Sequence, residues 1–130
     1  MVSKTNLKKK SHIVSQGPDR AAARAMLRAV GLQDADMEKP FIAVGNLASD
    51  VTPCNVHLTR IAEKVKEGLW NSNSVPFMFG TITISDGISM GTEGMKASLV
   101  SREVIADSIE TVTFGESMDG LVVVAACDKN

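Results

Sequence analysis

The sequence predicts an α/β fold in which a mainly parallel sheet lies between two layers of helices, a three-layer α/β/α sandwich. Short apolar runs bounded by glycine, proline or polar residues alternate with longer stretches whose apolar residues recur every three or four positions. Such alternation is typical of βαβ units, which build parallel sheets. The last apolar run, residues 121–126, lacks polar alternation, as expected for a strand covered on both faces.

The first predicted elements are a helix over residues 18–30 and a strand over residues 41–44. The helix has a proline in its first turn, apolar residues at helical spacing and Gly31 just past its end. The strand is a short apolar run between a proline and a Gly-Asn pair. Residues 1–16 carry four lysines and no apolar core, which predicts a flexible basic tail and no signal peptide.

The elements that follow are predicted from the same two patterns. A second helix is expected to begin near Cys54, since apolar and charged residues then occupy opposite helical faces. Residues 75–84 contain one or two strand pieces split at Gly80 and end in a Ser-Asp-Gly turn signal. A glycine-rich loop over residues 87–94 leads to a third long helix over residues 98–112.

The composition of the chain excludes several classes of protein. A net charge of -1 offers no basic surface for nucleic acid, and 44% hydrophobic residues argue against disorder. No apolar stretch approaches the roughly 20 residues that a membrane-spanning helix needs. Two cysteines do not make a disulfide framework, so free thiols or metal ligands are favoured. We therefore expect an ordinary globular protein in the cytoplasm.

Side chains able to bind a metal follow three of the predicted strands. Ligands of open α/β sheets bind outside the carboxyl ends of the strands. Cys54 follows the first strand, Asp86 follows the second by one residue, and Cys127, Asp128 and Lys129 follow the last. Sulfur suits iron, whereas carboxylate oxygen suits Mg²⁺ or Mn²⁺. The pattern predicts a mixed site at one edge of the sheet.

Most of these residues also have a purely structural interpretation. Cys54 could be a small buried residue at a helix start, or a thiol whose pKa the helix amides lower. Cys127 could close the core, and Asp86 could simply form a turn. His57, three residues after Cys54, is compatible with a Cys-x-x-His ligand pair or with an ordinary helix surface. The glycine-rich loop over residues 87–94 is only a weak phosphate-binding signal, because its glycine spacing does not match the known motifs.

Longer motifs occur along the chain in a fixed order. They are Thr52-Pro53-Cys54-Asn55, Ile84-Ser85-Asp86-Gly87-Ile88-Ser89-Met90-Gly91, Glu93-Gly94-Met95-Lys96, Ser101-Arg102-Glu103-Val104-Ile105-Ala106-Asp107-Ser108-Ile109-Glu110 and Cys127-Asp128-Lys129-Asn130. With these motifs, residues 24–130 resemble the N-terminal region of the dihydroxy-acid and phosphogluconate dehydratase family. Within that family, the dihydroxy-acid dehydratases are the most similar branch.

The resemblance implies a role for each candidate ligand. Cys54 and Cys127, with a third cysteine further downstream in the family, would hold an iron–sulfur cluster, of the 2Fe-2S type in preference to 4Fe-4S. Asp86, Asp128 and a carbamylated Lys129 would bind Mg²⁺ or Mn²⁺. Carbamylation turns the lysine amine into an oxygen donor of the kind that these cations prefer.

The resemblance also implies the reaction and the size of the enzyme. The expected reaction removes water from a 2,3-dihydroxy acid to give a 2-oxo acid in valine and isoleucine biosynthesis. Family members are two-domain proteins of several hundred residues that form homodimers, and their catalytic serine base lies downstream. Residues 17–130 are therefore expected to be an incomplete N-terminal domain that binds the cluster and the metal, inactive alone. The alternatives are a sugar-acid dehydratase of the same family and a phosphate-binding module.

Overall fold

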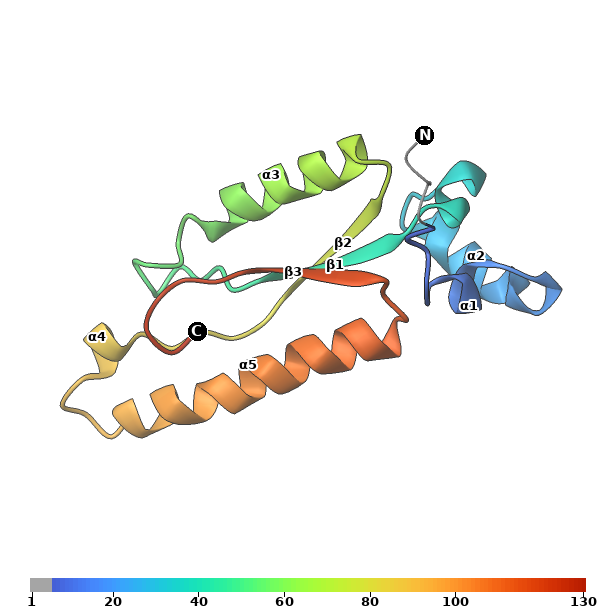
Figure 1. Cartoon of the computed structure of the whole chain (residues 1–130). Helices are drawn as coiled ribbons and strands as arrows, with labels where there is room; N and C mark the ends of the chain where they lie inside the picture. Colours follow the sequence, from blue (N-terminus) through green and yellow to red (C-terminus); the bar gives the residue numbers. More distant parts are fainter. Residues whose placement is uncertain (1–5) are drawn as a thin grey trace.

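A computed structural model describes residues 6–130 and confirms the α/β fold. Three parallel strands, β1 (Phe41–Asn46), β2 (Val75–Gly80) and β3 (Gly120–Val124), form a sheet in the order β2-β1-β3. Helix α3 (Leu58–Asn71) covers one face of this sheet, and helix α5 (Met95–Gly115) covers the other (Figure 1). The predicted sandwich of three layers is therefore present.

Strand β1 is the central strand and sets the register of the sheet. Val44 of β1 pairs with Met78 of β2 on one side and with Val122 of β3 on the other. Each connection between consecutive strands contains a helix, and the one from β2 to β3 crosses over β1, because parallel strands cannot be joined by a tight turn. The carboxyl ends of all three strands consequently meet at one edge, the edge near α4 and the C-terminus in Figure 1.

Two buried apolar clusters hold the layers together. The first joins the sheet to both long helices and contains Val44, Leu47, Leu58, Ala62, Ile105, Ile109 and Val124. Gly45 of β1 faces α5, and a Cβ atom there would be in ordinary contact, 3.6 Å, with the Ile109 side chain. The second cluster lies toward the amino ends of the strands and contains Leu32, Met37, Phe41, Ala43, Val75 and Met118.

The N-terminal part of the chain covers the amino ends of the strands. It contains α1 (His12–Ser15), α2 (Ala21–Ala29) and two short 3₁₀ helices, Pro18–Arg20 and Asp34–Glu38. The side chains of Val14 and Leu27 pack against the second apolar cluster. The helix predicted over residues 18–30 is thus confirmed, with its first turn in the tighter 3₁₀ form.

Residues 6–16 differ from the solvated tail that their lysines indicate. Asp119, just before β3, accepts five hydrogen bonds from the N-terminal segment and β1, at 2.5–3.0 Å. The donors are Lys9 N, Lys10 N, Ser11 N, Ser11 Oγ and Phe41 N. Lys8 is buried, with its ammonium 2.7 Å from Ser11 Oγ and 4.1 Å from the centre of the Phe41 ring. This segment is anchored because one carboxylate satisfies several backbone amides at once. Residues 1–5 of the predicted tail lie outside the described residues.

Two element boundaries differ from those expected. Helix α3 begins at Leu58, four residues after Cys54, because residues 52–57 form their own hydrogen-bonded turn. Strand β2 ends at Gly80, so Asp86 follows it by six residues and opens the short helix α4 (Asp86–Ser89). The third long helix is confirmed and is longer than predicted, since α5 runs over Met95–Gly115.

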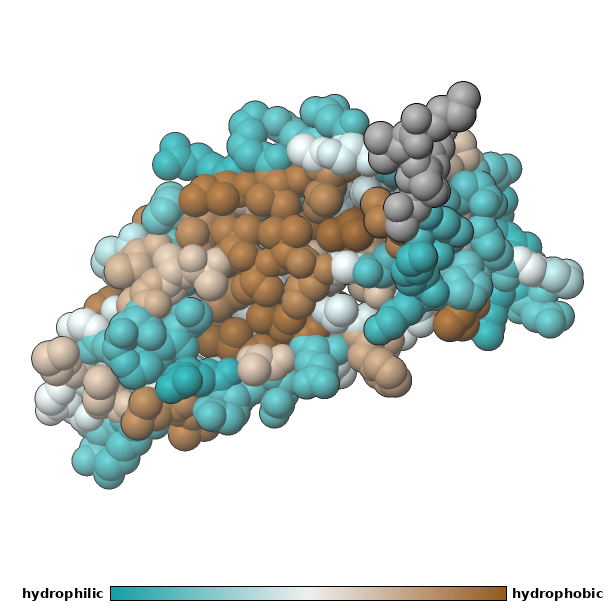
Figure 2. Space-filling view, in the orientation of Figure 1, coloured by the Kyte–Doolittle hydropathy of each residue, from teal (hydrophilic) through white to brown (hydrophobic). Residues whose placement is uncertain are grey.

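Strand β3 is less covered than its unbroken apolar sequence suggests. The side chains of Leu121 and Val123 are 42% and 43% exposed, so the prediction of cover on both faces is wrong. The reason is that α5 packs across the central strand β1, which leaves the outer strand partly open. Figure 2 shows a hydrophobic surface in the middle of this face of the molecule, with the hydrophilic surface of α3 above it. No helix over residues 6–130 is both long and apolar enough to cross a membrane.

Candidate metal and cluster site

Cys54 is held at the surface by a turn that is anchored by two buried polar residues, Thr52 and Asn55. Asn55 N and Val56 N both donate to Thr52 O, at 2.8 and 3.0 Å, and Asn55 Nδ2 donates to Leu47 O at 2.7 Å. The side chains of Thr52 and Asn55 are buried, whereas Cys54 is exposed. The Asn55 bond closes the loop after β1 and so carries the thiol to the carboxyl edge of the sheet.

Cys127 reaches the same edge at the end of β3. Its backbone has a φ of 79°, in the left-handed region that residues other than glycine rarely adopt. Such strain occurs where the surrounding structure fixes an unfavourable conformation, often at a functional site. The turn brings the Cys127 thiol within hydrogen-bonding reach of the Cys54 thiol. Two sulfur donors from strand ends far apart in the sequence thus lie together.

The acidity of Cys54 differs from the sequence-based expectation. The hydrogen bond and the charge of Cys127 raise the pKa of the Cys54 thiol above its usual value of 9.0. Helix amides do not lower it, because α3 starts one turn later than predicted. Neither interpretation of Cys54 offered by the sequence is found, since the thiol is exposed and its pKa is raised. A bound cation is what would favour the thiolate.

Asp86, Asp128 and Lys129 form a charged cluster beside the thiols. The Lys129 ammonium is hydrogen-bonded to Asp128 Oδ2 and lies 3.5 Å from Asp86 Oδ2. The hydrogen bond with Lys129 lowers the pKa of the Asp128 carboxyl, and the same bond raises the pKa of Lys129. Asp86 comes from the segment between β2 and α5, and the other two residues come from the end of β3. Sequence-distant carboxylates are therefore gathered around one positive charge.

This cluster fits a cation that carboxylates bind. The lysine ammonium lies between two carboxylate groups. A divalent cation in its place would be attracted more strongly by both carboxylates, because it carries twice the charge. Among residues 6–130, no group of three or more His, Cys, Asp and Glu side chains gathers closely enough to hold a metal ion. Two carboxylates and a lysine that can become a carbamate would thus be a partial ligand set. The paired thiols are likewise two soft donors of the kind that iron takes.

Two residues that the sequence did not single out contribute to this site. Ser98, in the first turn of α5, donates a hydrogen bond to Asp86 Oδ1. Arg102, one turn further along α5, lines a hollow together with Asp128 and Lys129, and its charge helps to lower the pKa of Asp128. The four-residue spacing of Ser98 and Arg102 on the predicted helix was a usable signal, because it places both on one face.

The glycine-rich segment between α4 and α5 is not built as a phosphate-binding loop. Ser89 N and Met90 N donate to Ser85 O and Asp86 O, and Thr92 N donates to Ser89 O. Amides that bond within the segment do not point at an anion. The carboxylate of Asp86 also stands in the first turn of α4, where it would repel phosphate. The geometry gives no support to a phosphate-binding module.

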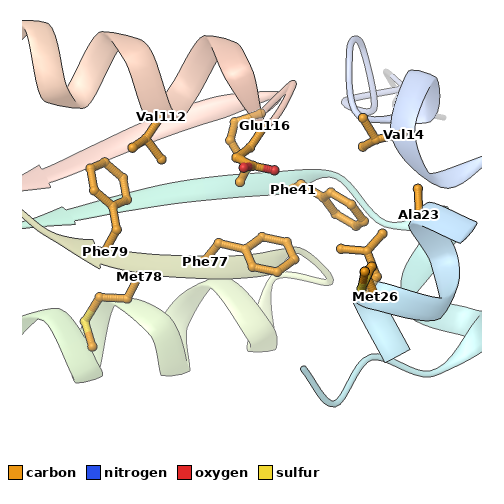
Figure 3. A pocket seen from close by; sticks show the side chains of 11 residues that line it. Val14, Ala23, Met26, Phe41, Phe77, Met78, Phe79, Val112 and Glu116 are labelled. Atoms are coloured by element: carbon orange, nitrogen blue, oxygen red, sulfur yellow. The ribbon is translucent and has the colours of Figure 1, made fainter. Parts of the chain in front are cut away.

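An apolar hollow of about 320 Å³ lies at the opposite, amino end of the sheet (Figure 3). Phe41, Phe77 and Phe79 line it from the strands, and Glu116 contributes a carboxylate from the chain after α5. None of the five candidate ligand residues borders it. The hollow is thus separate from the candidate metal and cluster site.

Comparison with known families identifies the class of protein to which this fold and these motifs belong. Residues 39–130 match the family model described as "Dihydroxy-acid/6-phosphogluconate dehydratase N-terminal". The chain belongs to this family. The matched region contains the whole sheet, both long helices and all five candidate ligand residues.

Individual relatives are similar over nearly the whole chain. A "Dihydroxy-acid dehydratase" of Natronomonas pharaonis is 62% identical over 93% of this chain and 20% of its own length. Proteins of the same name from Haloarcula marismortui and Halorhodospira halophila are 58% and 57% identical, over 90% and 94% of this chain. These matches cover 20% and 22% of those two relatives. The chain therefore spans about a fifth of the length of the relatives it matches.

Proposed function

We propose that this chain supplies the cluster- and metal-binding part of an enzyme that dehydrates 2,3-dihydroxy acids to 2-oxo acids in branched-chain amino acid biosynthesis. The observation that carries the proposal is the meeting of two thiols, two carboxylates and a lysine at the carboxyl edge of one parallel sheet. The names of the relatives support the same activity. Alone, the observed donors would leave both inorganic groups incompletely liganded.

Each proposed ligand has a defined task. Cys54 and Cys127 hold an iron–sulfur cluster, of the 2Fe-2S type, and Asp86, Asp128 and Lys129 hold Mg²⁺ or Mn²⁺. When bound, the iron and the divalent cation act as Lewis acids on the departing hydroxyl and on the carboxylate end of the substrate. The reaction removes the C2 proton and the C3 hydroxyl as one water molecule, and the resulting enol tautomerises to the 2-oxo acid.

Lys129 has to change its charge to act as a ligand. As an ammonium it competes with a cation for the two carboxylates. The hydrogen bond with Asp128 favours this charged form, because it raises the pKa of Lys129. The ammonium first loses one proton; the neutral amine then reacts with CO₂, which forms an N–C bond, releases a second proton and leaves a carbamate anion where the positive charge was. The set Asp86, Asp128 and carbamate then presents three anionic oxygen ligands, which suits Mg²⁺ or Mn²⁺.

Sugar-acid dehydration is the second candidate function. The matched family model includes 6-phosphogluconate dehydratases in its description. The relatives at 57–62% identity are named dihydroxy-acid dehydratases, which favours the branched substrate. Turnover of 2,3-dihydroxy-3-methylbutanoate and of gluconate, measured side by side, separates the two. Faster turnover of gluconate would reject the branched-chain assignment.

The cluster ligands can be tested directly in the protein produced from its complete gene. Anaerobic reconstitution with iron and sulfide should give visible cluster absorbance, and Cys54→Ser should abolish most of it, because the cluster loses one thiolate. Val56→Ala, an exposed change in the same turn, is the matched control and should keep the absorbance. Equal absorbance in Cys54→Ser and in the control would contradict the assignment of Cys54.

Two further expectations belong to the same proposal. The sequence composition supports a cytoplasmic location, and the family resemblance supports a homodimer. Residues 1–130 alone should show no dehydratase turnover, because the proposed ligands in this stretch are two thiols for the cluster and Asp86, Asp128 and Lys129 for the cation, which leaves both groups incompletely liganded. Turnover by this stretch alone, after reconstitution, would refute that expectation.

A further inference from the structure

Ser98 is a buried hydroxyl with a partner outside its own helix. Its side chain has no exposed surface, and its Oγ donates a hydrogen bond to Asp86 Oδ1. Asp86 lies in α4, twelve residues earlier, so the bond joins two helices. A buried hydroxyl that bonds a carboxylate restricts both side chains, and such a charge-assisted bond is stronger than a neutral one.

Other serines of α5 use their hydroxyl groups differently. Ser101 Oγ donates to Ser98 O at 2.7 Å, which is a bond within the helix. Ser108 Oγ donates to Ile105 O at 2.9 Å and also contacts Thr81 Oγ1. Serine in a helix commonly bonds back to the preceding turn in this way. Ser98 forgoes that local bond and reaches the carboxylate of the candidate metal site instead.

The link between α4 and α5 fixes the position of Ser98 relative to Asp86. Thr92 Oγ1 donates to Ser89 O at 2.7 Å and accepts from Gly94 N at 3.1 Å. A Cβ atom on Gly94 would lie 3.2 Å from Thr92 Oγ1, closer than most real contacts, so glycine suits this turn. The first turn of α5 is thus held next to α4, with Ser98 facing Asp86.

The two oxygens of Asp86 consequently have separate partners. Oδ1 accepts from Ser98, and Oδ2 lies 3.5 Å from the Lys129 amine. Turning the carboxylate to exchange the two oxygens would not alter this division. Turning the side chain to another rotamer would break the Ser98 bond and leave a buried hydroxyl unpaired, which is unfavourable.

We propose that Ser98 is a positioning residue that holds the Asp86 carboxylate in the orientation needed to bind the divalent cation. This inference rests on the proposed function, because it assumes that Asp86 is a ligand. In this role Ser98 acts through Asp86, its hydrogen-bond partner, and is not itself a ligand. Outer-shell partners of this kind typically change metal affinity 10–100-fold when removed.

The test measures Mn²⁺ binding to the protein produced from its complete gene, by the EPR signal of free Mn²⁺. Ser98→Ala should raise the dissociation constant about 10–100-fold, because the carboxylate loses its anchor. Ser98→Thr, which keeps the hydroxyl, should recover most of that loss. Ser101→Ala removes an equally buried hydroxyl that bonds only its own helix, and it should bind Mn²⁺ like the parent. Cluster absorbance should be the same in all four proteins.

Each other outcome overturns a defined part of the argument. Ser98→Ala with unchanged Mn²⁺ affinity, or with the same loss as Ser101→Ala, rejects the positioning role and leaves the proposed function intact. Failure of Ser98→Thr to recover binding also rejects it, since the hydroxyl is what the role requires. Loss of cluster absorbance in Ser98→Ala would show general disruption and reject it too. A parent protein that binds no Mn²⁺ refutes the proposed metal site, and this inference with it.

Discussion

The two ends of the sheet use carboxylates in opposite ways. At the amino end, both oxygens of Asp119 are taken by five donors from the N-terminal segment and β1. At the carboxyl end, Asp86 and Asp128 share one flexible lysine, and Asp128 is exposed. A carboxylate saturated by backbone amides stabilises the fold, whereas one with open lone pairs can bind a cation.

The difference shows how a structural carboxylate and a ligand carboxylate can be told apart within one chain. Partial burial acts to raise the pKa of Asp119, but hydrogen bonds from Lys10, Ser11 and Phe41 outweigh it and lower the pKa to about 2. These donors are backbone and hydroxyl groups that cannot leave. The partner of Asp128 is a side chain that a metal ion or CO₂ can displace or modify.

The largest expected effect is the loss of Asp119. Asp119→Ala leaves several backbone amides without an acceptor, so the free energy of unfolding should fall by about 2–4 kcal/mol. Urea unfolding followed by circular dichroism measures this. Asp107→Ala, an exposed aspartate on α5, is the matched control and should stay within about 0.5 kcal/mol of the parent. Equal effects of the two substitutions would remove the distinction between the two ends.

A smaller effect is expected from acid. The folded pKa of Asp119 lies below its usual value of 3.8, so its contribution is complete above about pH 4 and is lost as the pH falls toward 2. A fall of the pKa from 3.8 to about 2 corresponds to about 2–3 kcal/mol of stability, which solvent screening of this partly exposed carboxyl reduces to about 1–2 kcal/mol. Urea unfolding at pH 6, 4, 3 and 2.5 should show this loss in the parent. Asp119→Ala should lose less over the same range, and a parallel decline in both proteins would contradict the assignment.

The smallest effect on stability is expected at the carboxyl end. Asp128→Asn removes a charge whose partner is an exposed lysine contact, so the midpoint of urea unfolding should match that of the parent. The same variant should lose Mn²⁺ binding in the protein produced from its complete gene, because a ligand oxygen loses its charge. Strong destabilisation with intact Mn²⁺ binding would reverse the comparison between the two ends.

Much of the fold was predictable because its signals are local. Hydrophobic periodicity located the helices around Leu58 and Ile105, and the apolar runs located the strands. The anchoring of Lys8 was not predictable, since it depends on Asp119, more than a hundred residues later in the sequence. The exposure of β3 was also missed, because the packing of α5 over β1 is a tertiary feature that a local sequence pattern cannot indicate.

The site shows the same limit. Asp86, Cys127 and Asp128 stood out because polar or thiol groups follow strands, and parallel strands end at one edge. The exact starts of α3 and α4 decided the surroundings of Cys54 and Asp86, and helix boundaries are the least certain part of a sequence-based prediction. The spacing of Ser98 from Arg102 was the one signal for Ser98, and it does not reveal the bond to Asp86, because a serine in a helix usually bonds to its own helix.

The open edge of β3 links the growth of the sheet to the supply of ligands. Among residues 6–130, β1 is the strand that pairs with β3, and the opposite edge of β3 carries unpaired backbone groups. A strand that joined this edge in parallel would end beside Cys127. The same added strand would then widen the sheet and bring a further donor to the thiols. Backbone pairing at β3 and coordination chemistry at its end would be thermodynamically coupled, so each would strengthen the other.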